Sequence, residues 1–258
     1  MTSFPFTRAL ITGASSGIGE SMVELLGEAR VPMVIVARRE ERLQELAARY
    51  PDVEVLAADL TTARGLKAVE KRIVDPKQAP VDLVVNNAGF GTSGWFHEID
   101  AARLNDEVQL NIAALTRLSR AALGVMIPRG RGYLLNVSSV ASFQPAPKLA
   151  VYAATKAYVT SLSESLHEEA KPAGVHVTAL CPGLTHTEFQ SVSNTEAYTT
   201  DFPAWMWLQA RDVAEAGLQD VAKGRALSVP GALYKGLSAT VNVTPRSLKR
   251  RLSGMIQR

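Results

Sequence analysis

The sequence predicts an α/β fold, a doubly wound, seven-stranded parallel sheet with helices on both faces, and three observations support it. Short apolar runs alternate with amphipathic segments along the chain, which is the pattern of strands and helices in a parallel sheet. The first apolar run leads into a glycine-rich turn that opens an amphipathic segment. No internal repeat, low-complexity tract or linker interrupts the alternation. Residues 1–258 are therefore expected to form a single domain.

Composition narrows the class of protein. With 47% hydrophobic and 21% charged residues, the chain can bury a sizeable core. Its 28 basic and 25 acidic residues give a net charge of +3, too mild to indicate a nucleic-acid partner. A single cysteine, Cys181, excludes an internal disulfide, and the four histidines lack metal-ligand spacing, so no metal site is expected. Because the first strand begins almost at once and no apolar run is long enough for a membrane span, we expect a cytoplasmic protein.

A strand at residues 7–12 is expected to run into the turn GASSGIG at 13–19 and a helix at 17–29. Glycines let the backbone approach a ligand closely, and the free N–H groups of a helix N-terminus attract its charge. A strand, a glycine turn and a helix start in this order predict a cradle for a phosphate group.

The second strand, expected at residues 32–37, ends at Arg38 and Arg39. At this place in a doubly wound sheet, an acid accepts from the 2′-hydroxyl of an adenine ribose, whereas an arginine accommodates a 2′-phosphate. No acid stands here, so the sequence favours NADP over NAD. Arg38 is the better candidate, because Arg39 is also explained as a solvated residue that opens the next helix.

The middle of the chain continues the alternation, with strands at 53–57 and 81–85 and helices at 62–74 and 102–126. Asp59 and Leu60 follow one strand, and the turn NNAG at 86–89 follows the other. Ligands of open α/β sheets bind outside the carboxyl ends of the strands, so these turns should converge on one cleft. The long helix carries Asn111 in an apolar pattern, where asparagine is mildly unfavourable.

The next strand, at 133–137, ends at Ser138 and Ser139, and the helix at 151–170 carries Tyr152 and Lys156. Their four-residue spacing places the last two side chains on one helix face. A nearby cation lowers the pKa of a phenol from its usual value of about 10, so the pair predicts a proton donor and acceptor. Taken alone, the pair is also explained by a packed tyrosine and a solvated lysine. A strand at 175–180, a helix at 210–223 and a strand at 226–229 complete the sheet.

Four motifs in this order resemble the short-chain dehydrogenase/reductase family in its compact, single-domain, Rossmann-type form, over nearly the whole chain. They are TGASSGIG at 12–19, NNAG at 86–89, the serine pair with YAATK at 152–156, and the PG at 182–183 with threonines after it. Extended members of the family place a glycine where this chain has Ser16, and they carry a larger C-terminal substrate domain.

The resemblance implies a catalytic tetrad. Tyr152 would be the general acid/base that protonates a carbonyl oxygen while a nicotinamide delivers hydride. Ser139, thirteen positions earlier, would hold the same oxygen, which makes Ser138 the less suitable serine. Lys156 would bind the nicotinamide ribose and lower the pKa of Tyr152. Asn111 would hold a water that links Lys156 to solvent.

The resemblance also implies an NADP(H) site, with the glycine turn at the pyrophosphate, Ser15 and Arg38 at the 2′-phosphate, and the PG turn with its threonines at the nicotinamide carboxamide. The residues expected to contact the cofactor are Gly13, Ser15, Ser16, Gly17, Ile18, Gly19, Arg38, Arg39, Asp59, Leu60, Asn87, Ala88, Gly89, Tyr152, Lys156, Pro182, Gly183, Thr185 and Thr187.

The expected activity is the NADP(H)-dependent interconversion of a ketone or aldehyde with its alcohol. The alternative is a catalytically weak NADP(H)-binding sensor or regulatory module, against which the intact tetrad argues, although the fold alone does not prove catalysis. Family members pair the long helices that carry Asn111 and Tyr152, so the resemblance implies a homodimer or homotetramer.

Five of the sixteen aromatic residues lie between positions 184 and 210, which the family uses as a substrate lid. They are Phe189, Tyr198, Phe202, Trp205 and Trp207. A lid of this kind buries apolar area when it closes, so a bulky apolar substrate is expected. Phe189 and Trp205 should contact it together with Ser139 and Tyr152. The alternative is that these rings pack on the domain or on a partner subunit.

The C-terminal tail, residues 244–258, places Leu248, Leu252, Met255 and Ile256 at helical spacing among basic residues. We expect it to dock on its own domain or on a sister subunit. The alternative is peripheral contact with a membrane surface.

Overall fold

The computed structural model describes residues 3–195, 202–245, 247, 250 and 253. Within these residues, seven parallel strands form one sheet in the order β3-β2-β1-β4-β5-β6-β9. The strands are β1 (Ala9–Thr12), β2 (Met33–Ala37), β3 (Val53–Ala57), β4 (Leu83–Asn86), β5 (Gly132–Val137), β6 (Val175–Leu180) and β9 (Leu227–Ser228). The strand order reverses between β1 and β4, which is where doubly wound sheets bind their ligands. The predicted fold class is confirmed.

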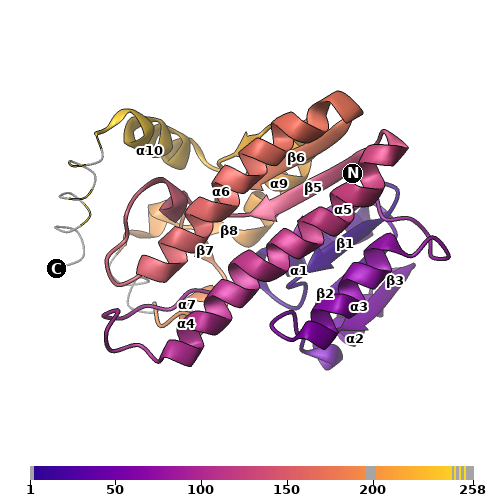
Figure 1. Ribbon diagram of the computed structural model, residues 1–258, viewed down its shortest axis with the longest axis horizontal. Helices are drawn as coiled ribbons and strands as arrows, with labels where there is room; N and C mark the ends of the chain where they lie inside the picture. The colour runs from indigo at the N-terminus through magenta and orange to yellow at the C-terminus, as the bar shows by residue number, and fades with distance from the viewer. Residues whose placement is uncertain (1–2, 196–201, 246, 248–249, 251–252, 254–258) are drawn as a thin grey trace.

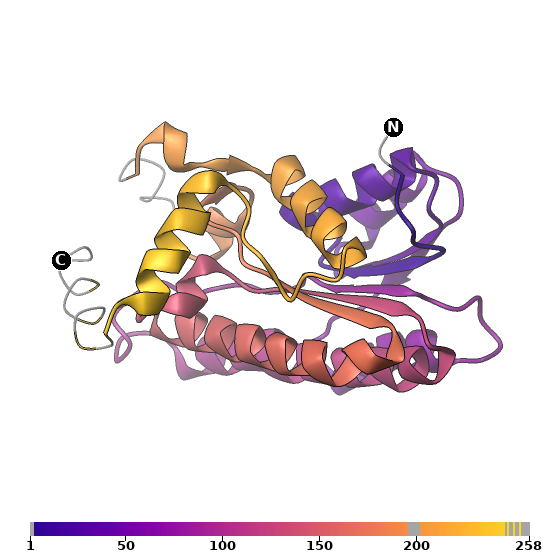
Figure 2. The same ribbon diagram turned by 90° about the horizontal axis from the view of Figure 1, so that it is seen from above.

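Helices cover both faces of this sheet (Figures 1 and 2). The α-helices of the described residues are α1 (Gly17–Glu28), α2 (Glu40–Ala47), α3 (Ala63–Val74), α4 (Ala101–Val108), α5 (Leu115–Arg129), α6 (Ala150–Ala170), α7 (Phe189–Val192), α9 (Ala210–Ala222) and α10 (Ala232–Val243). Residues of α1, α2 and α9 pack in one core cluster with Ile11 of β1, whereas residues of α3, α5 and α6 pack in another with Leu10. Because both faces of a strand are buried, the strands have continuous apolar sequences.

The first strand is shorter than the sequence predicts, and a side chain explains the difference. Asp82 accepts hydrogen bonds from the backbone N–H groups of Thr7, at 2.9 and 3.0 Å, and of Arg8, at 2.9 Å. These two residues therefore precede the ladder that begins at Ala9.

The helix predicted at 102–126 extends from Ala101 to Arg129 and has a π-helical turn at Gln109–Ala114. Asn111 lies in this turn, and isolated π turns occur frequently at functional sites. By length and composition, with a mean hydropathy of 1.3 over an 18-residue window, this is one helix that could cross a membrane. In the fold it is a core helix, whose residues Leu118, Ala122 and Met126 are buried in the cluster with α3 and α6.

At the carboxyl end of the sheet, α10 lies close to the segment before α9 (Figure 2). Strands β7 (Thr185–His186) and β8 (Leu208–Gln209) form a small parallel pair. Tyr234 of α10 ties this region together, because its hydroxyl donates to the Met206 carbonyl at 2.8 Å and accepts from the Leu184 N–H at 3.1 Å. The sequence did not predict α10. The apolar residues predicted to form the amphipathic tail, Leu248, Leu252, Met255 and Ile256, lie outside the described residues.

Candidate active site

A cavity of about 850 Å³ opens at the carboxyl ends of the parallel strands. Residues that follow β1, β2, β3, β4, β5 and β6 all line it. The predicted site residues that line it are Gly13, Ser15, Ser16, Gly17, Ile18, Arg38, Arg39, Asp59, Leu60, Asn87, Ala88, Gly89, Ser139, Tyr152, Lys156, Pro182, Gly183, Thr185, Thr187 and Phe189. The fold thus brings together residues that the sequence placed in separate motifs.

The glycine turn lines one end of the cavity. Gly13 and Gly17 have φ angles of +65° and +60°, the left-handed region that favours glycine. A Cβ at Gly13 would lie 2.8 Å from Nδ2 of Asn87, and one at Gly17 would lie 2.9 Å from Cγ2 of Thr187. A Cβ at Gly19 would collide with the Gly13 carbonyl oxygen, so this glycine serves the close packing of α1 on the turn and does not line the cavity.

Two arginines line the cavity beyond β2. Arg39 donates from Nε to Oγ of Ser15 at 3.2 Å and from Nη2 to the Ser15 carbonyl at 3.2 Å. Arg38 and Asp59 also line the cavity. Burial raises the pKa of the Asp59 carboxyl, but hydrogen bonds from Thr61 and the charge of Arg38 outweigh it and hold that pKa below its usual value. The structure therefore links Arg39 to the glycine turn, and the preference for Arg38 at the 2′-phosphate stays a prediction.

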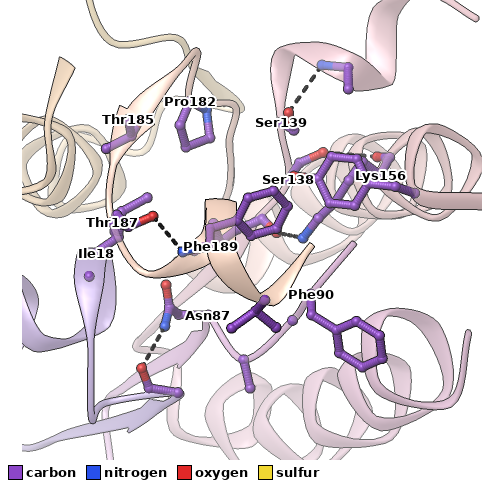
Figure 3. A pocket seen from close by; sticks show the side chains of 18 of the residues that line it. Ile18, Asn87, Phe90, Ser138, Ser139, Lys156, Pro182, Thr185, Thr187 and Phe189 are labelled. Atoms are coloured by element: carbon purple, nitrogen blue, oxygen red, sulfur yellow. Dashed lines mark hydrogen bonds between the residues drawn. The ribbon is translucent and has the colours of Figure 1, made fainter. Parts of the chain in front are cut away.

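Lys156, labelled in Figure 3, lies with its Nζ 5.7 Å from the centroid of the Tyr152 ring, and both residues line the cavity. The Lys156 side chain is 5% exposed, and its Nζ donates to the Val137 carbonyl at 2.8 Å. Burial lowers the pKa of Lys156 to about 8 and raises the pKa of Tyr152 to about 12, against a lowering contribution from the Ser139 hydroxyl. The pKa of Tyr152 is therefore raised where the sequence led us to expect it lowered, because loss of solvent dominates the environment of the phenol.

The two adjacent serines have different surroundings. Ser138 is 2% exposed, and its hydroxyl donates to the Lys156 carbonyl at 2.8 Å while sharing a 2.7 Å hydrogen bond with Thr160. The Ser139 hydroxyl accepts from the Ala141 N–H at 3.1 Å and lies beside Tyr152. Ser138 thus fixes α6 to the end of β5, and Ser139 is the serine of the pair that faces the phenol.

Asn111 is 1% exposed, and its amide is bonded to protein groups. Nδ2 donates to the Phe90 carbonyl at 2.8 Å and to Oγ1 of Thr155 at 3.1 Å, and Oδ1 accepts from the Phe90 N–H at 3.1 Å. These bonds connect the π turn to the loop after β4 and to α6. Asn111 does not line the cavity; its predicted role in holding a water stays a prediction.

Glu107 is a buried acid beside the site that sequence reasoning missed. It is 0% exposed, and no described group meets hydrogen-bond geometry with either of its carboxylate oxygens. Burial raises its pKa to about 7, while Thr92, Arg103 and Lys156 act to lower it. The available signal was its position four residues before Asn111, which places both on one helix face.

The end of the cavity near Tyr152 is apolar. Phe189 packs on Tyr152 with 5.3 Å between ring centroids, and Figure 3 shows it reaching over Lys156 from the segment after β6. Further apolar side chains come from the turn after β5, from residues 202–206 and from α10: they are Phe143, Leu149, Phe202, Met206, Leu237 and Val241.

Some aromatic residues of segment 184–210 line the cavity, whereas others pack on the domain or are exposed. Phe189 and Phe202 line the cavity. Trp207 is 8% exposed and stacks on His186 at 4.9 Å, so it packs on the domain. Trp205 is 70% exposed and is not among the described lining residues, because it lies on the outer side of the turn whose Met206 faces the cavity. Trp205 therefore lies away from the described cavity lining, where the sequence led us to expect a substrate contact. Tyr198 lies outside the described residues.

Comparisons with known proteins agree with this geometry. A family model described as short chain dehydrogenase matches residues 7–197. An uncharacterized oxidoreductase of Staphylococcus epidermidis is 32% identical over 209 residues, which cover 81% of this chain and 87% of the relative. The structure of a short-chain dehydrogenase from Sphingobium yanoikuyae in complex with NADPH is 34% identical, with a TM-score of 0.82 over 90% of this chain and 92% of that one. A bulky-bulky ketone specific alcohol dehydrogenase from Comamonas testosteroni is 30% identical, with a TM-score of 0.77 over 93% and 96%.

The matched region contains the glycine turn, Ser139, Tyr152 and Lys156. It therefore includes both ends of the cavity, and the resemblance inferred from the motifs is confirmed. The chain is an enzyme that belongs to the short-chain dehydrogenase family of oxidoreductases.

Proposed function

We propose that this enzyme binds NADP(H) along the cavity and interconverts a ketone or aldehyde with its alcohol, with Tyr152 as the acid/base. One observation carries the proposal: a single cavity joins the glycine turn at one end to Ser139, Tyr152 and Lys156 at the other. The similar dehydrogenase from Sphingobium yanoikuyae, whose structure is a complex with NADPH, supports the choice of cofactor.

The residues at the glycine end fit a dinucleotide. A Cβ at Gly13 would collide with Asn87 and Ala88, and one at Gly17 with Thr187, so only glycine allows the turn to lie this close to the other residues that line the cavity. The backbone can then approach a pyrophosphate. Arg38, Arg39 and the Ser15 hydroxyl also line the cavity and suit the anionic oxygens of a 2′-phosphate. Pro182 and Thr187 would hold the carboxamide end. When bound, the nicotinamide supplies or accepts the hydride.

The chain's own residues supply position and the proton. The Ser139 hydroxyl lies beside the Tyr152 phenol, so the two can bind the same carbonyl oxygen. With a pKa of about 12, Tyr152 is protonated at neutral pH and can donate its proton to that oxygen during reduction. The Lys156 ammonium stabilises the phenolate that results, because an opposite charge favours the ionised form. Phe189 packs on the Tyr152 ring and would limit the access of water to it.

For the substrate, we propose a bulky, apolar ketone or aldehyde. The apolar residues from α10 and from the turn after β5 make the cavity wide and largely hydrocarbon near Tyr152, which suits a ligand with large nonpolar groups on the carbonyl carbon. The similarity to the bulky-bulky ketone specific enzyme of Comamonas testosteroni supports this choice.

A screen of NADPH oxidation tests the activity, with aldehydes and ketones graded from acetaldehyde to diaryl ketones. We expect kcat/KM to rise with the apolar size of the substrate. A preference for short hydroxy-aldehydes would contradict the proposed substrate. Tight NADPH binding without turnover of any carbonyl compound would instead favour the sensor module.

A homodimer or homotetramer and a cytoplasmic location remain proposals. Sedimentation equilibrium of the purified chain tests the first, and a monomer at micromolar concentration would contradict it.

A further inference from the structure

Glu188 bridges two arginines across the mouth of the cavity. Its Oε2 accepts from Nη1 of Arg39 at 2.8 Å, and its Oε1 accepts from Nη1 of Arg42 at 2.7 Å. Arg39 and Arg42 belong to the end of β2 and to α2, whereas Glu188 stands directly before α7. This carboxylate therefore connects the segment after β6 to the adenosine side of the cavity.

The bridge occupies Nη1 of Arg39 and Nη1 of Arg42, two donors that a 2′-phosphate could use. Nε and Nη2 of Arg39 donate to Oγ of Ser15 at 3.2 and 3.1 Å, and Nη1 donates to Glu188. All three guanidinium nitrogens of Arg39 are thus engaged. The hydrogen bonds from Arg39 and Arg42 hold the pKa of the Glu188 carboxyl below its usual value, so the group is charged at neutral pH.

A phosphate and this carboxylate compete for the same place. A phosphate monoester has a charge of about −1.5 to −2 and three acceptor oxygens, whereas a carboxylate has one charge and two oxygens. Exposed carboxylate–guanidinium pairs are weak, and the Glu188 and Arg39 side chains are 41% and 44% exposed. The phosphate is therefore the stronger ligand, and repulsion between like charges disfavours both anions on Arg39 together.

We propose that Glu188 is a specificity-determining residue for the cofactor: the 2′-phosphate of NADP(H) takes the guanidinium donors that Glu188 holds in this structure, and the start of α7 is released. The proposal rests on the placement of NADP(H) in this cavity, as set out under the proposed function.

Release of the Glu188 carboxylate from the arginines would also affect the end of the cavity near Tyr152. The next residue, Phe189, packs on Tyr152. The Glu188 carbonyl accepts from the Val192 N–H at 3.2 Å, which makes Glu188 part of the turn of α7. NADH has no 2′-phosphate and leaves the bridge intact. Binding of the cofactor phosphate is thus coupled to the mobility of the segment that covers the substrate. Such coupling acts in both directions, so a substrate that favours the released segment also favours binding of the phosphate.

Binding of adenosine 2′,5′-bisphosphate and of adenosine 5′-monophosphate, measured by calorimetry, tests the competition in the parent and in Glu188→Gln. Glutamine keeps the size of the side chain and removes its charge. We expect the variant to bind the bisphosphate about threefold more tightly, because the exposed ion pair of Glu188 with Arg39 no longer competes, and to bind the monophosphate with unchanged affinity. Equal or weaker binding of the bisphosphate by the variant would overturn the proposal. A parent that binds neither nucleotide would overturn the cofactor site as well.

Glu28→Gln is the matched control. Glu28 forms a similar exposed bridge, to Nη1 and Nη2 of Arg211 at 3.1 and 2.7 Å, away from the cavity residues. It changes the net charge of the protein by the same amount. Its affinity for the bisphosphate should equal that of the parent, and a gain as large as that of Glu188→Gln would assign the effect to overall charge and overturn the proposal.

Hydrogen exchange of the amides that donate to α7 carbonyls tests the release. The Ser193 and Thr195 N–H groups donate to the carbonyls of Phe189 and Gln190 at 2.9 Å. Adenosine 2′,5′-bisphosphate should speed the exchange of these amides in the parent. In Glu188→Gln they should exchange fast before any addition and show no further change. Slower exchange in the parent on adding the bisphosphate would mean that the carboxylate stays in place, which overturns the proposal.

Discussion

The Lys156 ammonium lies 5.7 Å from the centroid of the Tyr152 ring. Lys156 is buried and Tyr152 is partly buried, and loss of solvent moves each pKa toward the neutral form, to about 8 for Lys156 and about 12 for Tyr152. The site therefore keeps a buried cation whose Nζ makes one protein hydrogen bond among the described residues, to Val137. A buried ammonium group lowers the stability of the fold but provides a positive charge at the site of reaction.

Lys156→Met should make the folded protein more stable at pH 7, by about 1–3 kcal/mol in the free energy of unfolding, because it removes the burial of an ammonium group. The pKa of Lys156 falls from 10.5 to about 8 on folding. Between these values the unfolded chain binds more protons, so the stability of the parent rises with pH and the advantage of the variant shrinks. Urea unfolding at pH 7 and pH 10 measures both effects. A variant less stable than the parent at pH 7 would contradict this explanation.

Glu107→Gln should change the pH dependence of stability in the opposite sense. Folding raises the Glu107 pKa from 4.5 to about 7, so the folded state binds more protons between these values. The stability of the parent therefore falls as pH rises through this window, and the variant should gain about 1–3 kcal/mol over the parent by pH 8. Urea unfolding at pH 5 and pH 8 tests it. Glu98→Gln, at an exposed side chain, is the control; a pH-independent difference for Glu107→Gln would refute the assignment.

Arg38→Asp should weaken NADPH binding roughly 10- to 100-fold, since it removes a charge-assisted phosphate contact and adds repulsion. NADH binding should change little, so the preference between the two narrows or reverses. Fluorescence titration of each cofactor gives the dissociation constants. Equal affinities for NADPH and NADH in the parent would defeat the claim.

Phe189→Ala should raise KM for diaryl ketones much more than for acetaldehyde, because the Phe189 ring packs beside Tyr152 in the cavity. Trp205→Ala should alter KM little for either substrate, since Trp205 is 70% exposed. Steady-state kinetics of both variants compare the two residues. A large, size-dependent effect at Trp205 alone would restore the role that the sequence suggested for it.

The motifs that the sequence predicted well are local. The glycine turn can be predicted because its left-handed backbone requires glycine at fixed positions. The ends of the strands can be predicted from the alternation of apolar runs alone. Helix α10 escaped prediction because its sequence contains Gly236 and several β-branched residues, and its order depends on distant contacts such as that of Tyr234 with Leu184.

The remaining differences come from tertiary packing. A glutamate on a helix is ordinarily solvated, so nothing local marks Glu107 as buried. The sequence also could not show that Arg39, rather than Arg38, bonds to Ser15, because that depends on how the chain turns at the end of β2. Likewise, the pKa of Tyr152 depends on burial that only the packed cavity determines.

The central claim is that Tyr152 transfers the proton, and single-turnover reduction of a bulky ketone by NADPH with Tyr152→Phe tests it most directly. The phenylalanine ring keeps the packing against Phe189 but has no proton to donate. We predict nearly unchanged NADPH binding and a rate reduced about 10²- to 10⁴-fold, as for a lost general acid. A variant that keeps more than about a third of the parent rate would contradict the assignment, because the loss of a general acid must cost far more.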